Sequence, residues 1–126
     1  MLEQLVDIIS DTSFLIHLAT NTITNLDSIE TEIGDLSFVV PEIVKKELDH
    51  LAKDPDKNTV VLQTLEYIKN FKTNSIIGAT ADLGILDFVE KNGGIVATMD
   101  RELKTKIKDA GGSVLSMHND KIVLEN

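Results

Sequence analysis

The chain has 126 residues, of which 42% are hydrophobic and 26% charged, the size and balance of one ordinary globular domain. Its net charge of −9 argues against a protein that coats nucleic acid, because non-specific affinity for phosphates comes mainly from Lys and Arg. The absence of cysteine excludes disulfides, thiol catalysis and Cys-based zinc sites.

Short apolar runs alternate with amphipathic stretches along the chain, and we predict that the runs are strands. Most of them are continuous rather than alternating in polarity and are rich in β-branched residues, which is typical of strands buried on both faces. The predicted strands are Val6–Ile9, Leu36–Val40, Asn74–Ile77, Ile95–Thr98 and Val114–Ser116, with Lys121–Leu124 as an added edge strand.

Helical patterns fill the gaps between these runs. We expect one or two helices within 20–34, after a polar start rich in Thr and Asn. Strands that alternate with helices predict a single α/β domain over residues 1–126, with a mostly parallel sheet between two helical layers. Apolar residues at helical spacing predict four further helices: one opened by Pro41 with Ile43, Val44, Leu48 and Leu51; one with Val61, Leu65, Ile68 and Phe71; one from about Ala79 to Lys91; and one from Asp100 to Ala110.

Two acidic residues stand at the ends of predicted strands. Asp11 comes just after the first run, and Asp100 follows Ile95–Thr98 and Met99. Parallel α/β sheets bind ligands outside the carboxyl ends of their strands. We therefore expect both side chains at the binding edge of the sheet.

Two further acids, Glu47 and Asp82, fall within the apolar stripes of predicted helices. Glu47 lies four residues after Ile43 and four before Leu51, and Asp82 lies three residues before Ile85. An acid on a buried helix face needs a partner charge, hydrogen bonds or a metal ion. We therefore expect both side chains to turn inward, toward the acids at the strand ends.

Each of the four acids also has a purely structural interpretation. Asp11 and Asp100 have the position of helix N-caps, Asp82 that of a first-turn charge favoured by the helix dipole, and Glu47 that of a surface partner of a nearby lysine. Taken singly, these interpretations are favoured, because isolated motif matches are weak. Taken together, two acids at strand ends and two on inward helix faces favour one converging site.

A cluster of carboxylates in a dry pocket needs a compensating charge, because like charges raise one another's pKa. Oxygen ligands, without Cys and without His at ligand spacing, suit Mg²⁺ or Mn²⁺ rather than zinc. Such an ion activates water and stabilises the charge on a phosphodiester during its cleavage. The neighbouring hydroxyls of Ser13 and Thr98 are candidates for orienting water at the site.

Four segments of the chain resemble the motifs of PIN-domain nucleases. Asp11–Ile16 is similar to the opening motif, an Asp followed by a small polar pair and an apolar helix start. Val39–Leu48 resembles the second motif, Thr80–Leu86 the third, and Val96–Lys104, the most specific of them, the fourth. Their order and spacing hold over nearly the whole chain, and the last segment resembles most closely the small archaeal PIN proteins related to rRNA-processing nucleases.

The resemblance implies a Rossmann-like three-layer α/β/α domain that cleaves single-stranded RNA with Mg²⁺ or Mn²⁺, in a family that frequently forms dimers. It also implies that the four acids are metal ligands or water positioners and that two hydroxyls support them. The acids are Asp11, Glu47, Asp82 and Asp100, and the hydroxyls are those of Ser13 and Thr98.

One position departs from the pattern of the family. Many members carry a second acid directly after the third-motif Asp, where this chain has Leu83. One bound metal ion is therefore favoured over two, and Asp87 is left open as a substitute acid. Because cysteine is absent, the zinc ribbon found in one rRNA-processing branch is missing.

Three basic residues, Arg101, Lys104 and Lys108, fall on one helix face beside the fourth motif. A phosphate backbone that runs past the metal ion would meet them there. The alternative is an ordinary solvated helix face, which the nearby acids Glu102 and Asp109 support. Both interpretations are kept open at this point.

The sequence therefore predicts a cytoplasmic, metal-dependent endoribonuclease that acts on single-stranded or structured RNA in rRNA processing or RNA decay. No secretory signal and no apolar run of roughly 18 residues are found, so no membrane association is expected. The alternatives are the ribonuclease of a toxin–antitoxin pair, a non-catalytic PIN scaffold that binds RNA or protein, and a metal-dependent phosphatase. A homodimer, an antitoxin and a ribosome-assembly partner are all compatible with this prediction.

Overall fold

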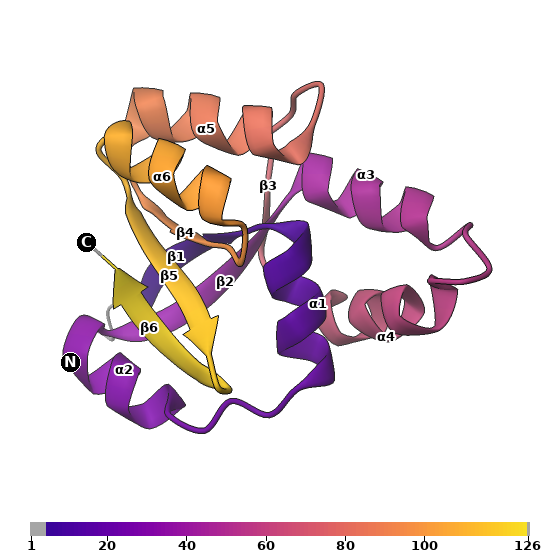
Figure 1. Cartoon of the computed structure of the whole chain (residues 1–126), viewed down its shortest axis with the longest axis horizontal. Coiled ribbons are helices and arrows are strands. Elements are labelled where there is room, and N and C mark those ends of the chain that lie inside the picture. The colour runs from indigo at the N-terminus through magenta and orange to yellow at the C-terminus, as the bar shows by residue number, and fades with distance from the viewer. Residues whose placement is uncertain (1–4, 126) are drawn as a thin grey trace.

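A six-stranded sheet runs through the middle of the chain in the computed structural model (Figure 1). The structure describes residues 5–125, apart from the side chains of residues 31 and 32, so residues 1–4 and 126 of the predicted domain lie outside the described residues. The strands are β1 (Leu5–Ser10), β2 (Asp35–Pro41), β3 (Thr73–Asn74), β4 (Ile95–Ala97), β5 (Ser113–His118) and β6 (Lys121–Glu125).

The sheet is parallel except at one edge. Its strand order is β3-β2-β1-β4-β5-β6, and only β5 and β6 pair in antiparallel fashion among the described strands. The order reverses at β1, because the chain adds β2 on one side of it and β4 on the other. Such a switch point leaves a crevice at the carboxyl ends of the two central strands, β1 and β4.

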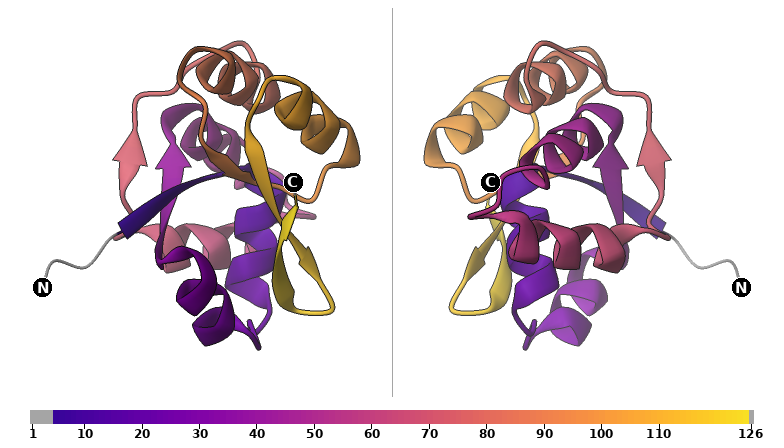
Figure 2. Two further views of the ribbon diagram at one scale, coloured as in Figure 1. Left: turned by 90° about the vertical axis from the view of Figure 1, so that its left-hand side faces the viewer. Right: turned by 90° about the vertical axis from the view of Figure 1, so that its right-hand side faces the viewer.

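Helices cover both faces of this sheet, as predicted. Figures 1 and 2 show α5 and α6 against one face and α1, α2 and α4 against the other, while α3 leaves the end of β2 and contacts both α4 and α5. This arrangement confirms the predicted Rossmann-like α/β/α fold class. The helices are α1 (Thr12–Thr20), α2 (Leu26–Ile33), α3 (Glu42–Leu51), α4 (Asn58–Ile68), α5 (Ala81–Asn92) and α6 (Arg101–Asp109).

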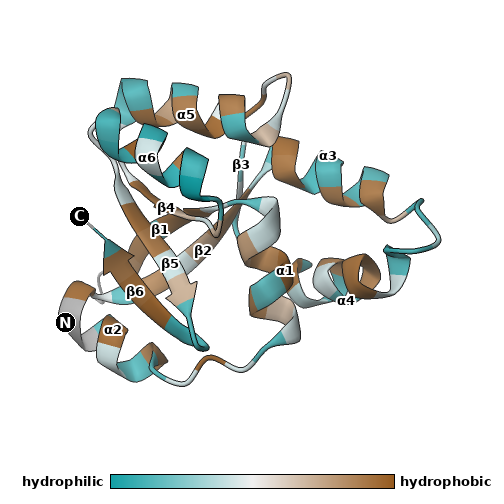
Figure 3. Ribbon diagram, viewed as in Figure 1, coloured by the Kyte–Doolittle hydropathy of each residue, from teal (hydrophilic) through white to brown (hydrophobic). Residues whose placement is uncertain are grey.

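The sheet buries apolar residues on both faces, which explains why its strands read as continuous apolar runs. Ile8, Val96 and Val114 on β1, β4 and β5 are completely buried. Phe14 of α1 packs on Phe38 of β2, with ring centroids 5.7 Å apart. In Figure 3 the central strands are accordingly mostly hydrophobic (brown), whereas the helices carry both hydrophilic (teal) and hydrophobic segments. Among the described residues, none of the helices has the length and apolar character needed to cross a membrane.

Two predicted segments extend too far. Of the predicted strand Asn74–Ile77, only the first residue belongs to the sheet, in the two-residue β3. The chain leaves the sheet there, because the carbonyl of Ile76 accepts a hydrogen bond from the N–H of Ile43 at 3.0 Å and so joins the segment to α3. Phe71, predicted in the stripe of α4, lies beyond the end of that helix.

The start of α5 lies close against the loop that precedes it. A Cβ on Gly84 would stand 2.8 Å from the carbonyl oxygen of Ile77, and one on Gly78 would stand 2.9 Å from the Cα of Gly84. Both neighbours are backbone atoms, so a side chain at either position would have to displace the loop or the helix. The two glycines therefore determine where α5 begins relative to the sheet edge.

We predict that Gly84→Ala lowers the free energy of unfolding by about 1–3 kcal/mol, the usual cost of overpacking, although Ala favours an open helix interior by about 1 kcal/mol over Gly. Urea denaturation followed by circular dichroism measures this change. Glu90→Ala, at an exposed position of the same helix, is the control and should change stability by less than about 0.5 kcal/mol. A Gly84→Ala variant as stable as the wild type would contradict the packing argument.

Candidate active site

Asp11 stands at the carboxyl end of β1 and is also the N-cap of α1. Only 4% of the residue is exposed. Its Oδ1 accepts hydrogen bonds from the Phe14 N–H at 2.8 Å and the Ser13 hydroxyl at 3.0 Å, and its Oδ2 accepts one from the Thr98 hydroxyl. The structural and the functional interpretation of Asp11 therefore describe the same side chain, which is held firmly through both of its oxygens.

Burial raises the pKa of the Asp11 carboxyl above its ordinary value, because little water remains to solvate the charge. The hydrogen bonds from Thr98, Phe14 and Ser13 act in the opposite direction, and the negative charge of Asp82 adds to the increase. The donors offset only part of the desolvation. A positive charge placed beside Asp11 would therefore stabilise its ionised form.

Asp100 follows β4 and is the N-cap of α6. Its Oδ1 accepts hydrogen bonds from the N–H groups of Glu102 at 2.9 Å and Leu103 at 3.2 Å. Its own N–H donates to the Thr98 hydroxyl oxygen at 3.0 Å, so Thr98 joins Asp100 to Asp11. Its Oδ2 has no hydrogen-bond partner among the described residues. Capping thus leaves one oxygen of Asp100 available to a ligand.

Glu47 holds the starts of two helices together. It is half-buried on α3, where its Oε1 accepts a hydrogen bond from the Thr12 hydroxyl at 3.0 Å and its Oε2 accepts one from the Ala81 N–H at 2.8 Å. Thr12 and Ala81 are the first residues of α1 and α5, so the carboxylate lies at the positive ends of two helix dipoles. Glu47 therefore points inward, as its place in the apolar stripe predicts.

Asp82 is exposed, so the expectation that it lies on the buried line of its helix is wrong. The buried positions near the start of α5 are those of Ala81, Gly84 and Ile85, whereas Asp82 on the first turn is exposed. The pKa of Asp82 is nevertheless raised, first by partial desolvation and then by the negative charges of Asp100 and Glu47. These interactions place Asp82 in the same electrostatic environment as the other acids.

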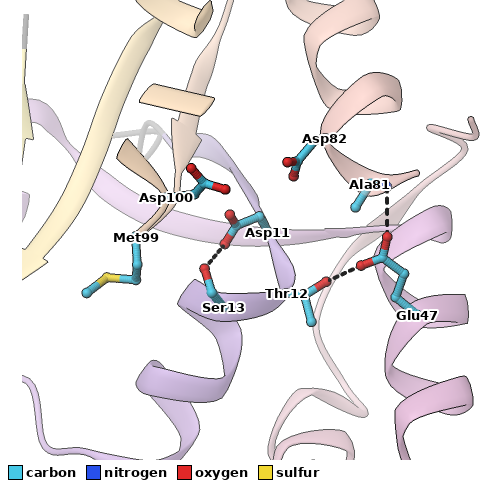
Figure 4. Close-up of a pocket in the computed structure, with 8 residues that line it drawn as sticks. All are labelled: Asp11, Thr12, Ser13, Glu47, Ala81, Asp82, Met99 and Asp100. Atoms are coloured by element: carbon cyan, nitrogen blue, oxygen red, sulfur yellow. Dashed lines mark hydrogen bonds between the residues drawn. The ribbon is translucent and has the colours of Figure 1, made fainter. Parts of the chain in front are cut away.

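The four acids line one hollow of about 370 Å³ at the carboxyl edge of the sheet. Figure 4 shows the carboxylates of Asp11, Asp82 and Asp100 on the same side of the hollow, while Glu47 lies apart, bonded to the two helix starts. No Lys or Arg is among the described residues that line it. The lining consists of Asp11, Thr12, Ser13, Glu47, Ala81, Asp82, Met99 and Asp100.

Three helices begin at this hollow, namely α1, α5 and α6. Their N-terminal N–H groups attract anions, which helps to keep the carboxylates ionised. Each N-terminus supplies only about half a positive charge, so three of them leave about two and a half of the four negative charges without compensation. One divalent cation would supply most of that charge.

The donor atoms at the hollow also suit such a cation. They are carboxylate and hydroxyl oxygens, the ligands that Mg²⁺ and Mn²⁺ prefer. Within the described part of the chain, no three acidic, histidine or cysteine side chains stand close enough together to hold a metal ion between them. An open arrangement fits Mg²⁺, which keeps several waters and takes only one or two carboxylates.

The residues that support the acids were only partly predicted. Ser13 and Thr98 both donate to the buried carboxylate at the end of β1, as their supporting role requires. Thr12 and the N–H of Ala81, which hold Glu47, were not predicted. Thr12 could have been found from its position directly after the first acid. The N–H of Ala81 could not, because every residue except proline has a backbone N–H and the sequence does not mark the one that donates.

The predicted RNA-contacting lysines of α6 have a partner within the chain. Lys104 and Lys108 each pair with Glu125 of β6 at 3.1 Å. The pKa of Glu125 is lowered to about 2, chiefly by the hydrogen bond from the Ser116 hydroxyl and further by these two lysines. Both lysines thus anchor α6 to the β5–β6 edge, while Arg101 is exposed and has no ion-pair partner among the described residues. Contact with RNA stays a prediction for all three.

Comparison with known proteins gives two kinds of match. A family model described as a PIN-like domain matches residues 8–120. The chain is similar to the structure of the PIN domain endonuclease Utp24, at 25% sequence identity and a TM-score of 0.73, over 94% of this chain and 90% of that one. It also shares the fold of a domain of a functionally unknown protein from Methanocaldococcus jannaschii DSM 2661, at 18% identity and a TM-score of 0.63, over 90% and 91% of the two chains. No curated protein matches it.

We predict that Asp82→Asn stabilises the metal-free protein at neutral pH. Because the folded-state pKa of Asp82 is raised above its ordinary 3.8, stability falls as the pH rises from 3.8 through the raised value and stays lower above it. Asn removes this cost at pH 7 but gives no gain at pH 3. Thermal melts at both pH values, in a chelator, measure the difference.

Addition of Mn²⁺ supplies the second half of this test. The melting temperature of the wild type should rise because the cation binds only the folded state, and the rise should be smaller in Asp82→Asn. Asp49→Asn is the matched control, since Asp49 pairs with Lys45 at 2.9 Å on α3, away from the hollow. An Asp82→Asn protein that is less stable than the wild type at pH 7 would refute the repulsion between the acids.

Proposed function

The chain belongs to the PIN-like domain family, and on that premise we propose that it is a metal-dependent endoribonuclease that cleaves single-stranded RNA. The structural match to an endonuclease supports a nuclease-type function. The observation that carries the proposal is the convergence of Asp11, Asp82 and Asp100, from the ends of β1 and β4 and the start of α5, on one hollow (Figure 4).

Asp11 and Asp100 would hold the cation, either Mg²⁺ or Mn²⁺, with Asp82 and Glu47 beside it. When bound, the cation would polarise an oxygen of the phosphate group and activate a water molecule for attack on the phosphorus. Asp11 offers oxygens whose direction is fixed by three donors, and Asp100 offers the oxygen that capping does not use. Asp82, exposed on the first turn of α5, has the freedom to adjust to an ion.

The position after Asp82 favours one cation over two. Leu83 stands where many family members carry a second acid, and its side chain is exposed and offers no oxygen. Asp87, the substitute left open by the sequence, pairs with Lys91 at 3.0 Å on the outside of α5. Neither residue supplies a further ligand at the hollow, because neither belongs to its lining.

The chain's own residues prepare the site for an anionic substrate. The bonds that Glu47 makes to the starts of α1 and α5 hold two helix N-termini beside the acids. Those N-termini favour a phosphate group. The net charge of −9, and a hollow with no Lys or Arg among its described lining residues, disfavour the binding of double-stranded nucleic acid, which depends on many phosphate contacts. A short single-stranded segment that enters at the sheet edge fits these limits.

The proposal is tested by incubating labelled single-stranded RNA with the protein and Mn²⁺ or Mg²⁺. Asp11→Asn and Asp100→Asn should each lose more than about 100-fold in cleavage rate, because even groups that only support a metal ligand contribute about 10- to 100-fold. Asp100→Asn is the cleaner variant, since Asn is as good an N-cap as Asp. Asp49→Asn, with the same charge change on the surface of α3, should cleave like the wild type.

The other functions left open by the sequence correspond to other outcomes. Equal cleavage by the wild type and Asp100→Asn would refute the proposal. Stabilisation by Mn²⁺ without cleavage of any RNA would instead favour a non-catalytic scaffold. Release of phosphate from a generic ester, with RNA left intact, would indicate a phosphatase. The choice among rRNA processing, RNA decay and a toxin role depends on the RNA that is cut and stays a prediction.

A further inference from the structure

Two smaller depressions lie next to the carboxylate hollow. Each shares one acid with it: Glu47 on the side of α3, and Asp82 on the side of α5 and α6. The three depressions are therefore neighbours on the surface, from α3 to α6. We refer to the three together as the track.

The α3 end of the track is lined by Lys46, Glu47, His50 and Leu51. The Lys46 side chain is 65% exposed, and its ion-pair partner among the described residues is Glu42, one turn earlier on the same helix and 3.9 Å away. A pair of this length between exposed side chains contributes little to stability. The ammonium group of Lys46 is therefore available to an anion from outside.

The other end of the track lies between α5 and α6. Lys106 is 53% exposed there and pairs with Glu102, one turn earlier on its own helix, at 3.6 Å. Its positive charge lowers the pKa of Asp82, against the effect of the surrounding acids, so the ammonium lies within electrostatic reach of the hollow. This end is lined by Asp82, Leu83, Leu86, Glu102, Leu103 and Lys106.

These two lysines differ from the pair that the sequence singled out. Lys104 and Lys108 have less exposed side chains, at 19% and 34%, and both are bound to Glu125 of another element at 3.1 Å. Lys46 and Lys106 have only weak partners within their own helices. A phosphate group would therefore compete with weaker carboxylate contacts at Lys46 and Lys106 than at Lys104 and Lys108.

We propose that the track binds one polynucleotide strand, with Lys46 and Lys106 contacting the phosphates on either side of the one at the hollow. This inference rests on the proposed function. A strand carries a negative charge at every nucleotide, so one centred on four carboxylates needs cationic contacts on both flanks. A small phosphate ester would occupy the hollow alone and gain from neither lysine.

The composition of the track also indicates how the strand is held. Leu51 and Leu83 provide an apolar wall at the two ends, and no Phe, Tyr or Trp is among the described residues that line the three depressions. Among those described residues, the imidazole of His50 is the one ring on which a base could stack. Phosphate contacts position a strand without reading its sequence. We therefore expect the flanking nucleotides to be bound with little sequence preference.

The test measures binding of a fluorescent single-stranded RNA of about a dozen nucleotides, in Mg²⁺ and at several salt concentrations. Asp100→Asn serves as the background, because it keeps the helix cap and, on the proposed function, cleaves more than about 100-fold more slowly than the wild type. A gel run after each measurement checks that the RNA is intact. In this background, Lys46→Gln and Lys106→Gln should each weaken binding several-fold. Each should also reduce the slope of log affinity against log salt by about 0.7, the loss of one phosphate contact on a single strand.

Lys45→Gln provides the matched control, because Lys45 pairs with Asp49 at 2.9 Å on α3 and does not line the track. It should change neither the affinity nor the salt slope. Equal losses in Lys45→Gln and Lys46→Gln, no loss in either track variant, or no binding of RNA at all would overturn the inference. If RNA binding depends on both lysines but the wild type does not cleave RNA, the nuclease proposal is refuted and strand binding by the track is supported. If the wild type cleaves RNA and neither lysine affects binding, the nuclease proposal is supported and strand binding by the track is refuted.

Discussion

The hydrogen bonds around the buried carboxylate of Asp11 are the constraint on which the rest of the structure depends. A carboxylate in a residue that is 4% exposed persists only if donors replace the lost water. One donor is the first turn of α1, which the carboxylate caps, and another is the hydroxyl of Thr98 beyond β4. Thr98 accepts in turn from the N–H of Asp100, which caps α6. The same bonds therefore align the two central strands and the starts of two helices at the switch point of the sheet.

This alignment has an electrostatic consequence that leads to the proposed chemistry. The helix N-termini and hydroxyls at the hollow stabilise carboxylates only in part. The pKa of Asp11 stays raised by burial and by the charge of Asp82, and the pKa of Asp82 by burial and by the charges of Asp100 and Glu47. The remaining negative charge favours a divalent cation, and a cation among carboxylates can activate water for the cleavage of a phosphodiester. The acidic character of the whole chain is then compatible with a nucleic-acid substrate. Lys46 and Lys106 would contact a strand locally, in a chain whose net charge is −9.

Prediction from the sequence succeeded where one residue satisfies two requirements at once. Asp11 and Asp100 were placed correctly, because each follows an apolar run and precedes a helix, a pattern that can be recognised in a short stretch of sequence. The same pattern puts the residue at the carboxyl edge of the sheet, where ligands bind. Glu47 was placed inward from its helical spacing, but its bonds to Thr12 and the Ala81 N–H depend on how three helices meet. Asp82 was misplaced, because the buried face at the start of α5 is formed by the small residues Ala81 and Gly84, which a stripe of large apolar side chains does not reveal. The partners of Lys104 and Lys108 lie on β6 and depend on tertiary contacts in the same way.

We propose that the carboxylates at the switch point bind one divalent cation. Crystals of the protein grown with Mn²⁺ test this proposal through anomalous diffraction measured at the manganese edge. We expect a single anomalous peak in the hollow, in contact with oxygens of Asp11 and Asp100 and approached by Asp82. An empty hollow at saturating Mn²⁺, or a peak bound elsewhere on the chain, would contradict it.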